Sequence, residues 1–122
     1  MSEPLEDARR IQTEAAAEGF DWPADASAAL WAKLQEEILE LQQADDLGAR
    51  AEELGDLLFM VVNLARHLHL DPAAALSAAN RKFERRFGHI MAQAHALPPI
   101  GDPARLDAME ALWREAKAIE RR

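Results

Sequence analysis

Lys33-Leu-Gln-Glu-Glu-Ile-Leu-Glu40 and Glu53-Leu-Gly-Asp56 are the two stretches of this chain that say most about its structure. Each carries two acidic residues three positions apart: Glu37 and Glu40 in the first, Glu53 and Asp56 in the second. Residues at this spacing lie on the same face of an α-helix. We therefore expect two consecutive helices, each with a pair of carboxylates on one face.

These carboxylates indicate a metal site if the two helices pack antiparallel. Two like charges about 4 Å apart repel by roughly 4 kcal/mol at an effective dielectric constant of 20, so a cluster of four must be protonated or bind cations. Ligands that are all oxygen, without cysteine or histidine, favour Mg²⁺ or Mn²⁺. The alternative is an ordinary solvated acidic face. A ferritin-like di-iron centre is excluded, because it needs Glu-x-x-His and no histidine here follows a glutamate by three.

The composition favours an all-α fold in one domain. The 122 residues include 26 alanines but only two valines, one threonine and no tyrosine, a balance that favours helices over strands. A chain of this length forms one domain, so we predict a single domain over residues 1–122. The formal net charge of −8 argues against nucleic acid or an anionic membrane as a partner.

Three features of the sequence favour the cytoplasm. The chain has no cysteine, which fits a reducing compartment. Its first residues are acidic and polar, unlike a signal peptide. Its longest apolar run, residues 57–62, is too short to span a bilayer. We therefore expect a cytoplasmic protein.

Caps and breaks in the sequence predict five helices. Their expected ranges are residues 4–18, 27–43, 49–68, 72–95 and from 103 onward. Gly19 is expected to end the first helix, and Ser27 or Asp25 to cap the second. Asp71 and Asp102, each followed by proline, should open the last two. The second and third helices should be antiparallel neighbours, because the connection between them is short.

The two acidic helices differ in their apolar residues. The second helix has an ordinary core stripe of Leu30, Trp31, Leu34, Ile38 and Leu41. Lys33 lies with Glu37 and Glu40 along one edge of that stripe, between core and solvent. In the third helix, residues 57–62 are apolar around the whole circumference. One small domain offers little to bury such a helix, so we predict that it packs against a second subunit. Met60 and Asn63 continue the face of Asp56 toward the far end of the site.

The fourth helix has a basic side opposite an apolar one. Its apolar face is Phe83, Phe87, Ile90 and Ala94, and its basic side chains are Lys82, Arg85, Arg86 and His89. The basic side is either a solvated face or a clamp for phosphate oxygens. Arginines outnumber lysines eleven to three, so the lysine at Lys82 suggests that a compact point charge is needed there.

The ordered combination of E-E-x-x-E at residues 36–40 and E-x-x-D at residues 53–56 resembles the MazG-type nucleoside triphosphate pyrophosphohydrolases, an all-α family. The likeness continues through residues 53–59, 62–67 and 79–87 and covers roughly residues 19–117. It implies an antiparallel helical bundle completed by tight homodimerisation, as a homodimer or a dimer of dimers. It also implies hydrolysis of nucleoside triphosphates between the α and β phosphates, which gives the monophosphate and pyrophosphate.

The resemblance implies a role for each candidate site residue. The metal ligands for Mg²⁺, with Mn²⁺ as a possible substitute, would be Glu37, Glu40, Glu53 and Asp56. We expect more than one ion in the substrate complex, because the triphosphate adds negative charge to an anionic site. The triphosphate would be held by Asn80, Lys82, Arg85 and Arg86. Trp113 would stack on the nucleobase beside Lys117, although a tryptophan in a small domain is as often a core residue. Trp22 is a weaker candidate for the base.

The candidate catalytic residues are Glu36 and Lys33. Glu36 is expected to orient or deprotonate the attacking water, with an outer-ligand role or simple solvation as alternatives. Two other classes of function stay open: a non-catalytic helical interaction module and a nucleotide sensor. The short connection after Glu40 leaves little material for a specificity lid, which favours a broad-range house-cleaning enzyme. The preferred nucleotide stays open.

Overall fold

The computed structural model describes residues 3–121, and over that range the chain is all-helical, without strands. The elements are α1 (Pro4–Ala17), α2 (Ser27–Gln43), α3 (Leu47–His67), α4 (Pro72–Met91), the short 3₁₀ helix η1 (Ala94–Ala96) and α5 (Pro103–Glu120). The predicted all-α fold is confirmed. The helices form two compact units, one up to Ala75 and the other from Leu76, with α4 passing from the first into the second.

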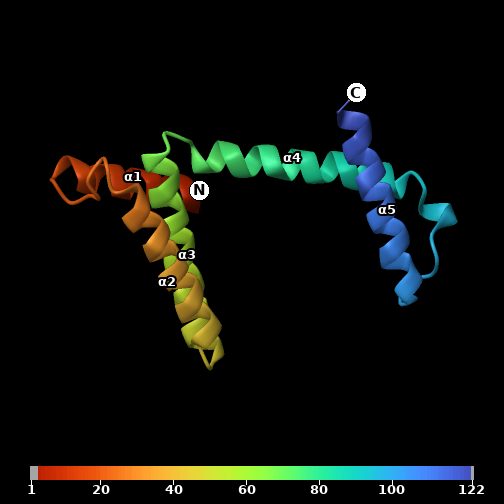
Figure 1. Cartoon of the computed structure of the whole chain (residues 1–122), viewed down its shortest axis with the longest axis horizontal. Helices are drawn as coiled ribbons and strands as arrows, with labels where there is room; N and C mark the ends of the chain where they lie inside the picture. The colour runs from red at the N-terminus through yellow and green to blue at the C-terminus, as the bar shows by residue number, and fades with distance from the viewer. Residues whose placement is uncertain (1–2, 122) are drawn as a thin grey trace. The chain divides into compact units, whose positions relative to one another are not determined.

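The first unit is built on the pair α2 and α3. The two helices lie side by side, run antiparallel and are joined by a short loop, as predicted (Figure 1). α1 packs against α3, near the end of the pair at which α2 begins and α3 ends (Figure 1). The buried apolar side chains of this unit include Leu30 of α2 and Met60 and Val62 of α3. The packing of α2 against α3 thus determines where the predicted metal ligands lie.

Side-chain caps decide where several helices begin. Asp46 accepts a hydrogen bond from the Ala49 N–H at 2.8 Å, so α3 starts at Leu47, two residues earlier than predicted. Asp71 and Asp102 cap α4 and α5, as predicted. The predicted cap of α2 is wrong: its N-cap residue is Ala26, without a side-chain hydrogen bond.

α1 and α3 both end at a residue with left-handed backbone. At the end of α1 this residue is Gly19, with φ of +89°, as predicted for a C-terminal cap. At the end of α3 it is His69, with φ of +60°, and the Leu70 N–H donates to the Ala65 carbonyl at 2.8 Å. A side chain in this region costs roughly 1–2 kcal/mol, so α3 ends in a strained turn.

The second unit comprises the rest of α4, η1 and α5. Ile90 and Ala116 are its buried apolar side chains, and Phe83 packs against the Trp113 ring at a centroid distance of 5.5 Å. α4 ends at Met91, four residues before the predicted end, because residues 94–96 form the 3₁₀ helix. Phe83 is 55% exposed within this unit, so the predicted core face of α4 is only partly covered.

Much apolar surface in the first unit is left uncovered. On α3, Leu54, Leu58 and Val61 point outward, and Leu58 is 50% exposed. Trp31 of α2, which we expected in the core, is 46% exposed. None of the helices within residues 3–121 has both the length and the apolar character that a bilayer crossing requires.

Candidate functional site

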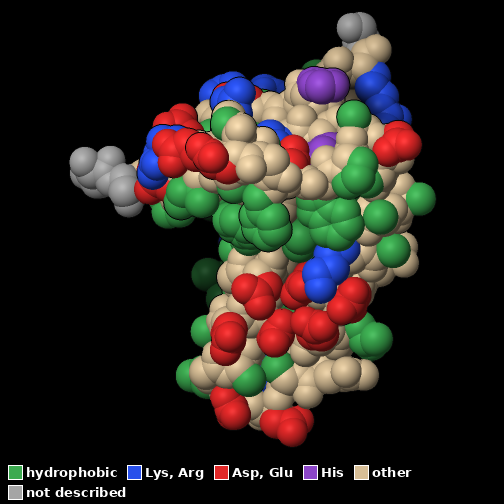
Figure 2. Space-filling model, turned by 90° about the vertical axis from the view of Figure 1, so that its left-hand side faces the viewer, with side chains coloured by type: hydrophobic (Ala, Val, Ile, Leu, Met, Phe, Trp, Pro, Cys, Tyr) green, Lys and Arg blue, Asp and Glu red, His purple; other side chains and the backbone are tan. Residues whose placement is uncertain are grey.

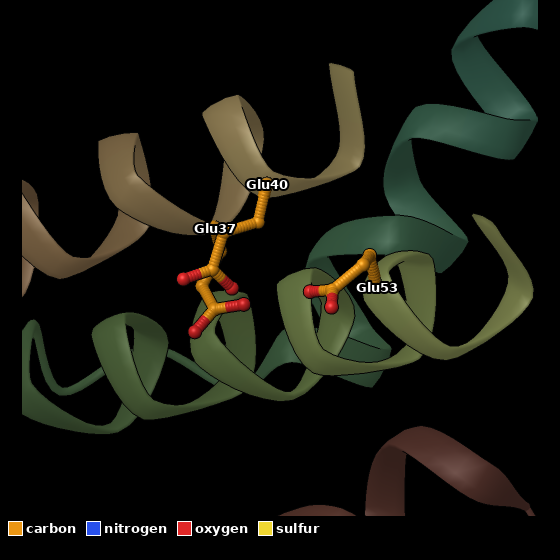
Figure 3. Close-up of side chains that lie close together, drawn as sticks. All are labelled: Glu37, Glu40 and Glu53. Carbon is orange, nitrogen blue, oxygen red and sulfur yellow. The ribbon is translucent and has the colours of Figure 1, made fainter. Parts of the chain in front are cut away.

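Three glutamates of the first unit converge between α2 and α3. Glu37 and Glu40 reach across from α2 toward Glu53 of α3 (Figure 3). One carboxylate oxygen from each residue lies within 4.8 Å of the other two. Glu37 is 6% exposed, and the other two are half-buried. The structure thus brings together three of the four residues that we predicted as metal ligands.

Lys33 is the cation that this cluster contacts. Its Nζ lies 3.2 Å from Glu37 Oε1 and 3.4 Å from Glu36 Oε1. The bonds to these two carboxylates, to Glu37 above all, raise the pKa of Lys33 above its usual value. One ammonium cannot balance three converging carboxylates, so the cluster keeps an excess of negative charge.

The crowding of negative charge affects the pKa of Glu40 and leaves carboxylate oxygens of Glu37 and Glu53 without partners within the described residues. Burial, followed by the neighbouring charge of Glu37 and the proximity of Glu53, raises the pKa of Glu40 above its usual range. The Oε2 atoms of Glu37 and Glu53 are buried and have no hydrogen-bond partner within the described residues. A buried carboxylate oxygen without a partner is costly. A hard cation between the helices would satisfy both atoms, and an all-oxygen donor set fits Mg²⁺ or Mn²⁺.

Asp56 and Glu36 lie at the border of the cluster. Asp56 follows Glu53 by one turn of α3, but it is exposed and is not among the three converging carboxylates. Glu36 is also exposed and contacts Lys33 alone among the charged residues that the structure describes. Figure 2 shows that many acidic side chains lie on the surface of the α2–α3 pair. The wider surroundings of the cluster are therefore anionic as well.

The candidate phosphate-binding residues belong to the second unit. Asn80 and Lys82 are exposed on α4. Arg85 and Arg86 both bind the carboxylate of Glu120, with nearest distances of 2.9 Å in each case. These two arginines, Arg86 first, lower the pKa of Glu120 to about 2. Two adjacent guanidinium groups of α4 thus hold one oxyanion.

Trp113 is not a free ring in this unit. Arg86 lies over it at 5.4 Å from the ring centroid, and Phe83 packs against it. Lys117, one turn further along α5, is half-buried. Trp113 therefore has a structural role in the second unit, and a contact with a nucleobase stays a prediction.

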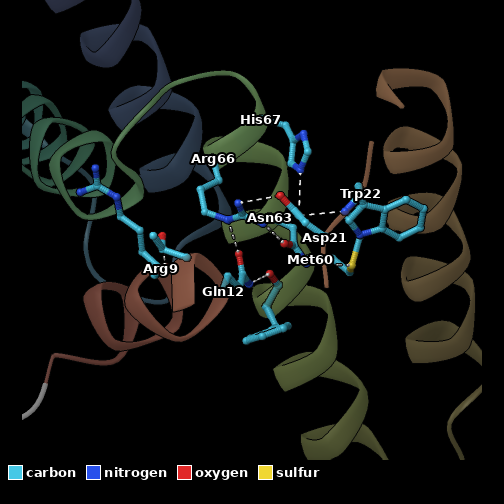
Figure 4. Close-up of polar contacts among 10 residues, drawn as sticks. Arg9, Gln12, Asp21, Trp22, Met60, Asn63, Arg66 and His67 are labelled. Atoms are coloured by element: carbon cyan, nitrogen blue, oxygen red, sulfur yellow. Dashed lines mark hydrogen bonds and ion pairs between the residues drawn. The ribbon is translucent and has the colours of Figure 1, made fainter. Parts of the chain in front are cut away.

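A polar network at the other end of the α2–α3 pair was not predicted from the sequence. Arg66 of α3 donates to Asp21, Gln12 and Asn63, and His67 lies 3.2 Å from Asp21 (Figure 4). Gln12 and Asn63 are 5% and 8% exposed, respectively. Only Asn63, which lies on the same face of α3 as Asp56, indicated this region from the sequence. Gln12 and Asp21 could not be connected with it, because they lie 54 and 45 positions from Arg66.

The two acidic helices, α2 and α3, lie in a segment that is similar to a known protein family. Residues 26–91 match the family model of the MazG nucleotide pyrophosphohydrolase domain. The chain belongs to the MazG family. The matched MazG segment contains α2, α3 and α4, and with them all the predicted metal ligands.

Two curated MazG relatives extend this match over most of the chain. One is the nucleoside triphosphate pyrophosphohydrolase/pyrophosphatase MazG of Thermotoga maritima, 38% identical over 110 residues, which are 90% of this chain and 42% of the relative. The other is the nucleoside triphosphate pyrophosphohydrolase of Escherichia coli K12, 39% identical over 118 residues, which are 93% of this chain and 44% of the relative. The chain thus spans less than half the length of these two relatives.

Proposed function

We propose that this chain hydrolyses nucleoside triphosphates between the α and β phosphorus atoms, with Mg²⁺, and releases the nucleoside monophosphate and pyrophosphate. The convergence of Glu37, Glu40 and Glu53, with two buried carboxylate oxygens left unpaired, carries this proposal. Membership of the MazG family and the names of its relatives support the same reaction.

The metal would be held by the three converging glutamates, with Asp56 as a fourth ligand from the next turn of α3. When bound, Mg²⁺ supplies charge neutralisation and polarisation of phosphoryl oxygens. Because a triphosphate adds negative charge to an anionic cluster, we propose more than one ion per site in the substrate complex, with Mn²⁺ as a possible substitute.

Glu36 and Lys33 are the proposed catalytic residues. Glu36 is solvent-exposed beside the cluster, so its carboxylate can accept a proton from a water molecule and orient it for in-line attack. Lys33 bonds both Glu36 and Glu37, so it can hold the Glu36 carboxylate in place. Lys33 also offsets part of the negative charge that the triphosphate meets.

The proposed triphosphate-binding residues are those of α4 in the second unit: Asn80, Lys82, Arg85 and Arg86. Arg85 and Arg86 both donate hydrogen bonds to the Glu120 carboxylate, which supports this proposal. A phosphoryl group also has negatively charged oxygens that can accept hydrogen bonds from guanidinium groups. Lys82 is exposed and makes no ion pair among the residues that the structure describes. Trp113 and Lys117 of α5 stay proposed contacts of the nucleotide.

We also propose that the chain works as a homodimer or a dimer of dimers. The outward apolar residues of α3, Leu54, Leu58 and Val61, support this assembly, since a contiguous exposed apolar patch is typical of a protein interface. The net charge of −8 supports the absence of nucleic acid and anionic membrane among the partners. The proposed substrates are nucleotides of the cytoplasm. The loop between α2 and α3 is short and leaves little material for a specificity lid, which supports a broad house-cleaning role.

A nucleotide panel tests the reaction. The chain should be incubated with Mg²⁺ and each of the common ribo- and deoxyribonucleoside triphosphates, and the products separated by anion-exchange chromatography. We expect monophosphate plus pyrophosphate from at least one nucleotide. Diphosphate plus phosphate would contradict the proposed reaction.

The same panel separates the two alternative functions. A nucleotide sensor would bind a triphosphate without turnover, and a helical interaction module would do neither. Glu37→Gln makes the distinction sharper: an enzyme loses turnover, whereas an interaction module keeps its partner and gains thermal stability as acid repulsion is removed.

A further inference from the structure

In the second unit, one carboxylate lies between two adjacent guanidinium groups. Arg85 Nε donates to Glu120 Oε1 at 2.9 Å. Arg86 donates to the other oxygen, Glu120 Oε2, from Nε at 3.1 Å and from Nη2 at 2.9 Å. A single negative charge thus faces two positive charges, so the three side chains together keep a positive charge that can attract a further anion.

The two arginines differ in how free they are to bind another partner. The Arg86 side chain is 15% exposed, lies over the Trp113 ring, and directs its Nε–Nη2 edge at Glu120. Arg85 is 59% exposed, and within the described residues it donates a hydrogen bond from Nε alone. Because a guanidinium group has five N–H donors, both terminal nitrogens of Arg85 remain available. An anion can therefore contact Arg85 directly, but it reaches the Nε–Nη2 edge of Arg86 only by displacing Glu120.

The Glu120 carboxylate is chemically similar to part of a phosphoryl group. Guanidinium groups bind carboxylates and phosphates through the same parallel hydrogen bonds, and a phosphoryl group offers more acceptor oxygens. Arg86 and Arg85 lower the pKa of Glu120 to about 2, so the carboxylate is ionised at neutral pH. Lys82 is exposed one turn before Arg86 on α4, so a phosphate at this place would meet a third cation. The carboxylate of Glu120 thus occupies a position that suits a phosphate.

The place of Glu120 in its helix makes the carboxylate easy to displace. Glu120 is the last residue of α5. A carboxylate at the C-terminal end of a helix is repelled by the negative end of the helix dipole, so the two arginines hold it there against that repulsion. The last turn of a helix also frays readily. Glu120 can therefore leave the arginines without a change in the rest of α5.

We propose that Glu120 is an internal competitor of phosphate groups for Arg86. Its carboxylate occupies the two arginines while no polyphosphate is bound, and the phosphates of a ligand displace it after they contact Arg85. This inference rests on the proposed function, since it assumes that Arg85 and Arg86 bind the triphosphate. The competition weakens the binding of pyrophosphate, the proposed product, because Glu120 returns to Arg86 as pyrophosphate leaves.

Glu120→Gln tests the proposal, because it removes the competing charge and keeps the shape of the side chain. Binding of pyrophosphate to the whole chain should be measured by calorimetry in EDTA, which prevents metal-bridged binding to the acidic cluster. We expect Glu120→Gln to bind pyrophosphate roughly 5- to 10-fold more tightly than the unmodified chain, the difference between a charged and a neutral hydrogen bond. The matched control, Glu110→Gln, removes the same charge from an exposed position of α5 and should leave the affinity unchanged.

Other outcomes overturn the proposal. Weaker binding of pyrophosphate by Glu120→Gln would mean that Glu120 holds the two arginines in position for the ligand instead of competing with it. An equal gain in affinity in Glu110→Gln would be a general effect of net charge. Equal affinity in all three proteins, or no binding by any of them, would mean that phosphates do not displace Glu120.

A measurement on the unmodified chain covers the case that Glu120→Gln fails to fold. The carboxyl carbon resonance of Glu120 should shift on adding pyrophosphate, and that of Glu110 should stay in place. A Glu120 resonance that does not move at saturating pyrophosphate would overturn the proposal. This readout needs no turnover, so hydrolysis of nucleoside triphosphates without the shift refutes the competition by Glu120 alone, whereas failure of hydrolysis refutes the proposed function.

Discussion

Arg66 of α3 binds both carboxylate oxygens of Asp21, with distances of 3.1 Å from Nη1 to Oδ2 and 2.7 Å from Nη2 to Oδ1. The two side chains are mostly buried, with 16% and 24% of their surface exposed. The pair fastens the loop between α1 and α2 to the end of α3. Loss of this ion pair should therefore lower the stability of the first unit.

Asp21→Asn should lower the free energy of unfolding by about 1.5–3 kcal/mol, the usual contribution of a hydrogen bond to a charged group. Arg66 holds the pKa of Asp21 well below its usual range. Because the pKa is lower in the folded chain than in the unfolded one, the contribution is complete at neutral pH and is lost as the pH falls from about 5. Denaturant titrations at pH 7, at pH 4 and at about pH 2 should show a difference in stability that is still mostly present at pH 4, near the ordinary pKa of aspartate, and that shrinks at about pH 2.

A matched control for this prediction is Glu14→Gln, which removes the exposed ion pair of Glu14 with Arg10. Exposed pairs on one helix contribute about 0.3–0.5 kcal/mol, so this change should be small at either pH. An Asp21→Asn effect as small as that of the control would mean that the Asp21–Arg66 pair is not a structural tie.

Glu40→Gln should have opposite effects on stability without and with metal. The raised pKa of Glu40 means that the fold disfavours its ionised form, so the neutral amide should not lower, and should raise, the melting temperature in EDTA. In Mg²⁺ at a hundred times its Kd, the unmodified chain should gain about 2.7 kcal/mol, and the variant should lose that gain. Scanning calorimetry with EDTA and with Mg²⁺ measures both.

Glu40→Gln and Asp56→Asn should also abolish hydrolysis while the helical circular dichroism stays intact, because each removes an anionic ligand without changing shape. The control is Glu52→Gln, which alters an exposed glutamate next to Glu53. Full activity in both variants, or an equal loss in the control, would refute the proposed metal ligands. Retained activity in Asp56→Asn alone would restrict the ligands to the three converging glutamates.

The acidic cluster could be predicted well because it depends on residues that are close to one another in the sequence. The spacing of Glu37 and Glu40 places both on one face of α2, and the short connection to α3 forces the helices to run antiparallel, so Glu53 had to lie nearby. The Asp21–Arg66 pair could not be predicted in this way. Its residues are 45 positions apart, and their contact depends on how α1 and the following loop pack against α3.

Burial was predicted less well than helix positions. A continuous apolar stripe on α2 suggested that Trp31 belongs to the core, yet the helices of its own unit leave it half exposed. The helical period tells which residues share a face, but not how much of that face another element covers. The same limit of the helical period applies to α3, where Met60 is buried and Leu58 is exposed within one apolar run.

Lys82→Ala and Trp113→Ala should affect nucleotide binding differently. If Lys82 holds the β and γ phosphates, its loss should lower kcat/KM for triphosphates strongly and barely change the affinity for the monophosphate, which lacks those groups. If Trp113 contacts the base, its loss should weaken both ligands by roughly 1–3 kcal/mol. Titration of each variant with a triphosphate analogue and with the monophosphate makes the comparison. Equal weakening of both ligands in both variants would mean that α4 does not clamp the phosphates.

Leu58→Lys should break up the proposed oligomer, since it places a charge in the outward apolar surface of α3. Met60→Lys is unsuitable for this purpose, because Met60 is buried within its own unit and a lysine there should unfold the chain. Sedimentation velocity of the unmodified chain, of Leu58→Lys and of the control Leu106→Lys on α5 tests the assembly. A stable monomer of the unmodified chain would refute the dimer directly.

The position of the bond that is broken tests the central claim most directly. Two triphosphate analogues differ only in which bridging oxygen is replaced by a methylene group, and a methylene bridge cannot be hydrolysed. With Mg²⁺, the chain should release the monophosphate from the β,γ-methylene analogue and leave the α,β-methylene analogue intact. Phosphate release from the α,β-methylene analogue, with the β,γ-methylene analogue left intact, would contradict the proposed pyrophosphohydrolysis.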